Sequence, residues 1–446
     1  MFNPKFEERM LHILGEEGFE SYKSEFSRKS PRAFRVNSLK AGDVDVSSLF
    51  DFELCPVPYC ENAFYFDYDK IGAHPLHHAG LIYVQEPGAM VPVSTIKIEP
   101  DFKIFDTCAS PGGKSLQASS FLNEKGFILS NEISSQRVKV MAGNFERMGV
   151  KNAVITSSEV GVVAKQFEDF FDLVIVDAPC SGEGMFRKEP EALKNWSEDY
   201  VLLCAERQKE ILESASVSVR GGGYLIYSTC TFSVEENEGV VNDFLSRHTD
   251  FELVSPCKRV LDYTLSGVGS DKFRRFYPHV APGEGQFSAL LQRKGDAFSP
   301  AKISGGALEL TKEERKITED FLKDTLISFD PSFIKKFKDY VVYIDPEIPV
   351  PQKITYSCGV TLGEVRHNYF QPHHQLFSAM GNLFKKKINL SLDDPRLESY
   401  LKGESINYDI ENGWVSVLAN SVCLGGGKAV NGQIKNHYPK GLRIQH

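Results

Sequence analysis

Between residues 102 and 292, short apolar segments of strand length alternate with longer segments of helical spacing. This alternation predicts a doubly wound α/β fold, in which helices cover both faces of a mostly parallel sheet. In such a sheet the residues that follow the carboxyl ends of the strands lie along one edge, where ligands bind. The strands are predicted at residues 102–106, 126–131, 153–156, 171–176, 223–229 and 286–292.

Two cysteines stand just beyond the ends of two of these strands. The strand at 171–176 is followed by Asp177-Ala178-Pro179-Cys180, and the strand at 223–229 is followed by Cys230. A single cysteine at a strand end is more often a small buried apolar residue than a nucleophile. Two cysteines at the ligand-binding edge raise the question of a shared chemical role.

A glycine-containing turn follows the first strand. The segment from Asp106 to Ser115 ends in Gly-Lys-Ser, as a phosphate-binding P-loop does, but position 108 is cysteine where that motif requires glycine. The adjacent glycines also fail the dinucleotide-binding fingerprint. What remains is a turn that brings backbone close to a ligand, with Glu132 after the second strand to hold ribose hydroxyls. S-adenosylmethionine is the leading candidate, and a purely structural turn is the alternative.

The regions on either side of this alternating segment have other patterns. A helix is predicted at 4–19 and strands at 32–37, 51–54 and 63–66, followed by a short strand and a helix near 88–93. A charged helix is predicted at 311–326, strands at 340–344 and 414–418, and glycine-rich turns at 425–427 and 432. The expected domains are an N-terminal α+β domain at 1–75, a catalytic domain at 76–294, a linker at 295–310, an accessory domain at 311–370 and a β-rich domain at 371–446.

Composition and charge disfavour several classes to which this protein could belong. Nine cysteines without a CxxC pair argue against a disulfide framework or zinc site and favour a reducing cytoplasm. The chain lacks the apolar run of a membrane span and the apolar core of a signal peptide. The net charge of −9 argues against binding nucleic acid over the whole surface, whereas residues 301–446 carry 19 basic and 17 acidic residues. A locally basic surface there suits one polyanionic partner.

Three motifs resemble the signature motifs of the RNA cytosine carbon-5 methyltransferases. They are Asp106-Thr-Cys-Ala-Ser-Pro-Gly-Gly-Lys-Ser, Asp177-Ala-Pro-Cys-Ser-Gly-Glu-Gly and Ser228-Thr-Cys-Thr. Arg35-Val36-Asn37 and Arg275-Phe276-Tyr277-Pro278-His279 are similar to an early and a late motif of that family. Residues 427–443 look like the end domain of its bacterial RsmF-like branch. The resemblance implies a Rossmann-like, S-adenosylmethionine-dependent methyltransferase core, a PUA-like RNA-binding C-terminal region, and 16S rRNA or the 30S subunit as the partner of a monomer.

The resemblance also implies roles for individual residues. Cys230 would be the nucleophile that adds to cytosine carbon 6, Asp177 would steady the protonated ring, and Cys180 would assist release of the methylated RNA. A thiolate suits such an addition because it is nucleophilic near neutral pH and is able to leave again. The cofactor contacts are then expected from Cys108, Ala109, Ser110, Pro111, Gly112, Gly113, Lys114, Glu132 and Asp177.

One position departs from the family pattern. The acid near the adenine, after the third strand, is usually aspartate, and this chain has Glu159 there, with Ser158 as a weaker candidate. The longer glutamate side chain still accepts a hydrogen bond from an adenine amino group but changes the geometry.

Basic residues at two places are candidate RNA contacts. Arg187 and Lys188 follow Cys180 and are expected to meet phosphates beside the target base, with exposed loop charges as the alternative. Residues 421–446 contain no acid, and their basic residues are expected to grip rRNA, with a solvated basic tail as the alternative. These C-terminal residues are Lys428, Lys435, Lys440 and Arg443. His74, His77 and His78 have no further ligand cluster near them in sequence, so no metal is expected.

Several other functions compete with this interpretation. A DNA cytosine methyltransferase would use Cys180 as its nucleophile, and an amino-group methyltransferase would need Asp/Asn-Pro-Pro-aromatic where this chain has Asp177-Ala178-Pro179-Cys180. The first is disfavoured by the Thr229-Cys230 pair and the RNA-type end domain. A non-catalytic ribosome assembly factor that binds rRNA, and an enzyme that modifies another RNA such as tRNA, stay open.

Overall fold

The main sheet of the molecule is doubly wound, as predicted. The computed structural model describes residues 2–42, 44–123, 125–296 and 306–444, and ten strands of these residues form the sheet, nine of them in the order β11-β12-β13-β9-β8-β5-β6-β7-β16 with β10 paired to β13. Its parallel strands are β5 (Lys103–Asp106), β6 (Phe127–Asn131), β7 (Ala153–Thr156), β8 (Phe171–Asp177) and β9 (Val219–Thr229).

Alternate residues of these strands pack against helices on opposite faces of the sheet. Phe105 and Val174 face one core, and Ile104 and Ile175 face the other. The first core is covered by α7 (Val160–Ala164), α9 (Glu198–Ser216) and α10 (Glu238–Arg247), and the second by α4 (Val91–Ser94), α5 (Gly113–Ser119) and α6 (Ser135–Met148). Both faces are therefore buried, which explains why the strands are almost continuously apolar.

The helix α6 illustrates how local sequence fixes an element. Ser134 accepts a hydrogen bond from the Arg137 amide at the N-terminus, and Gly149 ends the helix in the left-handed conformation at φ 72°. Both signals are ones that helices prefer at those positions.

The strand order reverses between β5 and β8. Strands β6 and β7 lie on one side of β5, and β8 and β9 on the other, so the carboxyl ends of β5 and β8 border the crevice where such sheets bind ligands. Antiparallel strands extend the sheet beyond β9. They are β10 (Phe251–Leu253), β11 (Leu265–Gly267), β12 (Ser270–Phe276) and β13 (Gln286–Arg293).

The N-terminal region forms a second, four-stranded sheet in the order β2-β3-β1-β4. Its strands are β1 (Arg32–Val36), β2 (Cys55–Pro56), β3 (Ala63–Phe66) and β4 (Ile82–Gln85), with the short helices α2 (Ser38–Ala41) and α3 (Pro75–His78). The predicted strand at 51–54 is wrong, because that segment is bent and only β2 follows it. The strand β4 of this sheet lies beyond residue 75, so the expected domain boundary at 75 would separate it from the strands with which it pairs.

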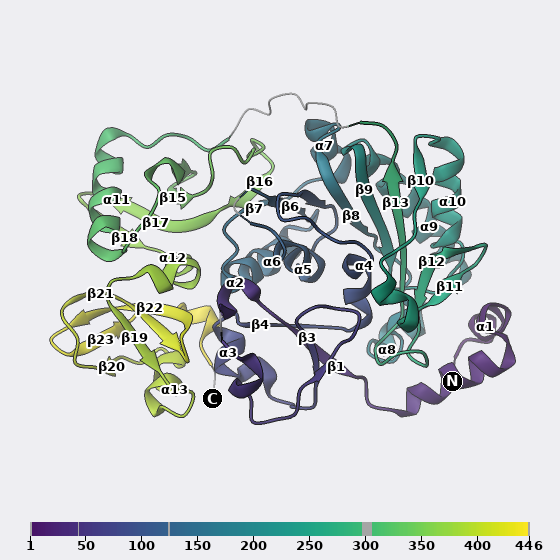
Figure 1. The fold of residues 1–446 in the computed structure, drawn as a ribbon, viewed down its shortest axis with the longest axis horizontal. Coiled ribbons are helices and arrows are strands. Elements are labelled where there is room, and N and C mark those ends of the chain that lie inside the picture. Colours follow the sequence, from purple (N-terminus) through teal and green to yellow (C-terminus); the bar gives the residue numbers. More distant parts are fainter. Residues whose placement is uncertain (1, 43, 124, 297–305, 445–446) are drawn as a thin grey trace.

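The first helix, α1 (Pro4–Ser24), lies apart from this sheet, at the right of Figure 1. Its residues Phe6 and Tyr22 belong to a core shared with Phe186, Trp196 and Phe232 of the catalytic region. The N-terminal helix is therefore packed beside the loops that follow β8 and β9.

The C-terminal region adds two further sheets, drawn in green and yellow in Figure 1. Residues 297–305 of the expected linker lie outside the described residues. The first sheet contains β14 (Ile334–Phe337), β15 (Tyr340–Tyr343), β17 (Val360–Arg366) and β18 (Tyr369–Pro372), with α11 (Lys312–Thr325) beside it. The second contains β19 (Lys387–Leu390), β20 (Ile406–Asn407), β21 (Gly413–Ala419), β22 (Val422–Val430) and β23 (Gln433–Asn436), with α12 (His374–Met380) and α13 (Pro395–Leu401).

Two features of this region differ from the sequence prediction. The glycines at 425–427 form no turn but lie inside the strand β22, where Gly426 lies under the ring of Phe377 of α12. The strand β16 (Thr355–Cys358) leaves its own region and pairs antiparallel with β7, so that it becomes the edge of the main sheet. In the part of the chain described here, no helix is both long and apolar enough to cross a membrane.

Candidate active site

A cavity of about 920 Å³ opens at the carboxyl edge of the main sheet. It is bordered by Asp106 and Asp177, the last residues of β5 and β8, and by Cys230, which follows β9. The turn after β5, the loop after β8 and the N-terminal strand β4 complete its wall, through Cys108 to Pro111, Pro179 to Gly182 and Tyr83 to Glu86. The cavity thus lies at the reversal of strand order, where the fold predicts a ligand.

The two cysteines meet in this cavity. The Sγ atoms of Cys180 and Cys230 are 3.1 Å apart, and both residues are partly exposed. The hydrogen bond with Cys230, together with burial, raises the pKa of the Cys180 thiol well above its ordinary value. Because two thiolates at this separation would repel strongly, the pair carries at most one negative charge near neutral pH.

Asp177 lies at the end of β8 and is fixed by three side chains. Its Oδ2 accepts from Lys114 Nζ at 2.8 Å, and its Oδ1 accepts from Ser228 Oγ at 2.7 Å and Gln286 Nε2 at 3.5 Å. Lys114 is buried, and Asp177 is about one third exposed, toward the cavity. The carboxylate is therefore held in one orientation but stays accessible to a ligand.

Asp106 is a second carboxyl group at the same edge. It is fully buried, and Ser115 Oγ donates to its Oδ2 at 2.6 Å, while its Oδ1 has no hydrogen-bond partner among the described residues. Burial raises the pKa of Asp106 to about 7. An unpaired oxygen on a residue that borders the cavity is a group that a ligand donor would satisfy.

The turn after β5 is held from both sides. Gly112 precedes α5 with φ at 108°, a conformation that favours glycine. Gly113 has the Gln85 side chain 3.3 Å from where a Cβ would lie, and its carbonyl accepts from Arg35 Nη2 at 2.9 Å. Residues of the N-terminal sheet therefore shape the turn, which the sequence did not predict. Burial raises the pKa of Cys108 to about 12, so this cysteine stays a thiol.

The two glutamates predicted to hold the cofactor lie in different environments. Glu132 is buried at the end of β6, accepts from the Ser134 amide at 2.8 Å and lies 3.4 Å from Arg137 Nη1. Glu159 is exposed before α7 and does not line the cavity. Glu132 does not line the cavity either, but it follows β6 at the strand end where ribose acids lie, whereas the placement of Glu159 and Ser158 gives their predicted roles no support.

The predicted RNA contacts also separate into two groups. Arg187 is buried in an ion pair with Glu284 and donates to the carbonyls of Glu25 and Gly283. Since all three nitrogens of its guanidinium bind groups of the protein, the prediction that it meets phosphate does not fit the structure. Lys188, in contrast, is exposed and lines the cavity.

In the C-terminal sheet, Lys428 and Lys435 are exposed and directly paired across β22 and β23. Trp414 of β21 is paired with Lys428 on the other side, and the Lys428 ammonium lies 5.7 Å from its ring centre. Lys440 is exposed, whereas Arg443 is partly buried and donates to the Tyr438 carbonyl. The first two lysines and Trp414 therefore form one row on the sheet surface.

His74, His77 and His78 lie at the short helix α3 of the N-terminal region. His74 accepts from the Leu76 amide, and His78 lies 3.2 Å from the Tyr438 hydroxyl. Among the described residues, no three His, Cys, Asp or Glu side chains are grouped as metal ligands.

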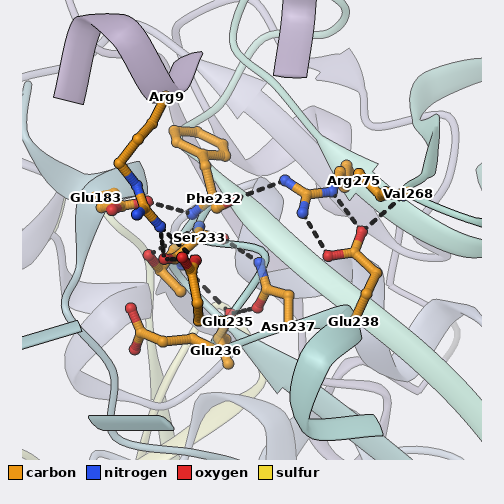
Figure 2. Close-up of polar contacts among 12 residues, drawn as sticks. Arg9, Glu183, Phe232, Ser233, Glu235, Glu236, Asn237, Glu238, Val268 and Arg275 are labelled. Carbon is orange, nitrogen blue, oxygen red and sulfur yellow. Dashed lines mark hydrogen bonds and ion pairs between the residues drawn. The ribbon is translucent and has the colours of Figure 1, made fainter. Parts of the chain in front are cut away.

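The loop after Cys230 is anchored by a row of acidic side chains, drawn in Figure 2. Glu235 and Ser233 bind Arg9 of α1, and Glu238 forms a buried ion pair with Arg275 of β12. Glu183 accepts from the Phe232 amide at 3.0 Å and from Trp196 Nε1. In the sequence, the one feature that could have predicted this network is the group of glutamates that follows Cys230.

Comparisons with known proteins agree with this fold. Residues 93–292 match the family described as 16S rRNA methyltransferase RsmB/F. Residues 2–87 match the N-terminal domain of 16S rRNA methyltransferase RsmF, and residues 387–444 match the methyltransferase RsmF PUA domain.

Curated relatives align along nearly the whole chain. The ribosomal RNA small subunit methyltransferase F of Vibrio vulnificus is 32% identical over 460 residues, which cover 99% of this chain and 96% of the relative. The protein of the same name from Klebsiella pneumoniae is 31% identical and covers 95% and 92%. Among solved structures, a methyltransferase homologue from Pyrococcus horikoshii has a TM-score of 0.57 at 26% identity and covers 66% of this chain and 95% of that chain.

The sheet, the cavity and these matches define a methyltransferase with a Rossmann-like core. The chain belongs to the RsmB/F family of methyltransferases and has the N-terminal and PUA domains of its RsmF members. The predicted fold class is therefore confirmed.

Proposed function

We propose that this protein transfers a methyl group from S-adenosylmethionine to carbon 5 of a cytosine in 16S rRNA, through a covalent bond between Cys230 and the base. The observation that carries the proposal is the pair of thiols 3.1 Å apart at the edge of the sheet, beside the fixed carboxylate of Asp177. The names of the relatives, which are rRNA methyltransferases, support the substrate.

The residues around the cavity fit the cofactor. The turn at 107–113 brings backbone close to the cavity, Glu132 stands at the next strand end, and the orphan Oδ1 of Asp106 offers a hydrogen-bond acceptor. S-adenosylmethionine supplies the methyl group when it is bound there. Glu132 would hold the ribose, and the turn from Cys108 to Lys114 the methionine part.

The protein residues supply nucleophilic and electrostatic catalysis. Carbon 5 of cytosine is a poor nucleophile until the Cys230 thiolate adds to carbon 6, which places electron density on carbon 5. Asp177 then hydrogen-bonds the edge of the ring and stabilises the positive charge of its protonated form. After methyl transfer, the proton on carbon 5 leaves to a base, the electron pair re-forms the ring double bond, and the Cys230 sulfur departs.

The surroundings of the two cysteines support Cys230 as the attacking group. Lys114 is the buried cation of the site, and its charge interacts with Cys230 as well as Asp177. Cys180, whose pKa is raised, remains protonated and suits a role after methyl transfer, when the adduct is resolved.

The test compares two single variants with labelled cofactor and 16S rRNA or 30S subunits. We expect Cys230→Ala to abolish methyl transfer, because no other thiol replaces the adduct former. We expect Cys180→Ala to accumulate a covalent protein–RNA complex that survives denaturing electrophoresis.

An active Cys230→Ala enzyme would refute the covalent mechanism, and an adduct formed through Cys180 would assign the attack to the other cysteine. Methyl transfer to tRNA instead of 16S rRNA would keep the chemistry and change the substrate. Binding of rRNA without any transfer by the wild type would support a non-catalytic assembly factor.

A further inference from the structure

A buried carboxylate is hydrogen-bonded to the residue that follows Cys180. Glu236 is completely buried in the loop between Cys230 and α10. Its Oε2 accepts from the Ser181 amide at 3.0 Å and from Gln208 Nε2 at 2.8 Å, and its Oε1 accepts from Ser181 Oγ. In the part of the chain that the structure describes, no ion pair joins Glu236 to a basic residue, unlike Glu238 with Arg275 or Asp177 with Lys114.

These hydrogen bonds connect the two cysteine loops. Ser181 follows Cys180, and its hydroxyl also lies 2.8 Å from Oγ1 of Thr231, which follows Cys230. Gln208 of α9 reaches the Pro179 carbonyl at 2.9 Å, on the other side of Cys180. The carboxylate therefore holds the backbone on both sides of Cys180 and, through Ser181, the residue after Cys230.

The charges around the cysteine pair are divided between its two sides. Cys230 is among the groups that raise the pKa of the cation Lys114, whereas the anion Glu236 raises the pKa of Cys180, after the larger effects of the Cys230 hydrogen bond, burial and the Cys230 charge. Burial raises the pKa of Glu236 itself to about 7, so the carboxylate is charged above that pH, where thiols titrate. The other titratable groups that face this pair are Asp177, Glu183, Tyr200, Cys204 and Tyr227.

We propose that Glu236 is a positioning residue that keeps Cys180 a thiol, so that Cys230 is the member of the pair that becomes the thiolate. This inference rests on the proposed function, which assigns the attack to Cys230. A carboxylate next to Cys180 disfavours a negative charge on that sulfur, so the first proton that the pair loses comes from Cys230 and the remaining proton stays on Cys180. The hydrogen bonds through Ser181 keep the two sulfur atoms close enough to share it.

Glu236→Gln removes the charge and keeps the hydrogen bonds. A glutamine oxygen in the place of Oε2 still accepts from Ser181 N and Gln208, and its amide in the place of Oε1 donates to Ser181 Oγ, which then donates to Thr231. Glu235→Gln is the matched control, because the neighbouring acid faces Arg9 and Ser233 instead of the cysteines.

The experiment measures alkylation of each cysteine by iodoacetamide against pH in the full-length protein without RNA or cofactor, with the first modified site identified by mass spectrometry. In the wild type and in Glu235→Gln we expect the alkylation rate of Cys230 to be at least ten times that of Cys180. In Glu236→Gln we expect the midpoint of Cys180 to fall by about 1 pH unit, so that its rate below the midpoint rises about tenfold.

Two results would overturn the inference. One is an unchanged Cys180 profile in a folded Glu236→Gln variant, and the other is equal reactivity of both cysteines in the wild type, which needs no variant at all. A wild type without methyl transfer would refute the proposed function but leave this measurement valid. An active enzyme with an unchanged Cys180 profile in Glu236→Gln would refute the inference alone.

Discussion

Around the active site, the buried acidic residues fall into two groups, according to whether they form an ion pair. Glu238 and Glu284 are buried with arginines, and each ion pair fixes a loop. Glu236 and Asp106 are buried and form no ion pair with any residue that the structure describes, and burial raises the pKa of both to about 7. Buried charge that lacks a partner is costly, and such residues cluster where chemistry needs them.

The Arg187–Glu284 ion pair gives a prediction at this scale. We expect Arg187→Met to lower the free energy of unfolding by about 3–5 kcal/mol, because it leaves the Glu284 carboxylate buried and unpaired. The measurement is denaturant unfolding of the variant against the wild type.

Lys188→Met is the matched control, since Lys188 is exposed, and we expect it to change stability by less than about 0.5 kcal/mol. An Arg187→Met protein of unchanged stability but weaker RNA binding would contradict this structural role and support the predicted contact of Arg187 with phosphate.

At the scale of single elements, β22 shows how glycines set the distance between a strand and a helix. Gly425, Gly426 and Gly427 have buried backbone within the strand, and two residues of α12 lie against it, the Phe377 ring at Gly426 and His374 at Gly425. A Cβ on Gly426 would lie 2.1 Å from that ring. The glycines therefore allow α12 to approach the sheet closely, and α12 in turn contacts α6 of the catalytic core.

A single methyl group tests this contact. We expect Gly426→Ala to destabilise the protein by about 1–3 kcal/mol, because the added carbon forces Phe377 or the strand to move. Thermal unfolding of the full chain measures the effect. Gly441→Ala is the control, since nothing lies within 4 Å of the added carbon, and equal stability of the two variants would contradict this packing.

At the scale of the whole molecule, regions that are far apart in sequence contribute strands and contacts to one another. Strand β16 of the C-terminal half completes the main sheet beside β7, and the N-terminal strand β4 supplies a wall of the active-site cavity. Lys40 joins three regions, since its buried ammonium donates to the Ala79 and Arg147 carbonyls and to Ser378 Oγ. The flanking domains are therefore parts of the catalytic structure as well as candidate RNA-binding surfaces.

The row of Trp414, Lys428 and Lys435 is the C-terminal surface that we predict to bind RNA. We expect Lys428→Glu with Lys435→Glu to weaken rRNA binding and to reduce the slope of log affinity against log salt by about 1.5–2, because two phosphate contacts are lost. Filter binding at several salt concentrations measures both quantities.

Lys97→Glu serves as the control, because Lys97 is 74% exposed on the catalytic core and is no part of the row. Unchanged affinity and slope in the double variant would exclude the row as an RNA contact.

The sequence determined the elements of the core and the two cysteines at its edge. The strands from β5 to β9 are apolar runs between helical segments, and the order of residues after β8 and β9 places Asp177, Cys180 and Cys230 at their carboxyl ends. These features depend on local periodicity and on the geometry of parallel sheets, both of which are readable along the chain.

Only the tertiary structure decided which charged residues are partnered and which distant segments meet. Arg187 and Glu236 are ordinary polar residues in sequence, and their roles follow from Glu284 and Ser181, which lie 97 and 55 positions away. The pairing of β16 with β7 and the wall from β4 likewise depend on contacts across domains. The physical reason is that burial and partners set the charge and energy of a polar side chain, and both come from residues that are remote along the chain.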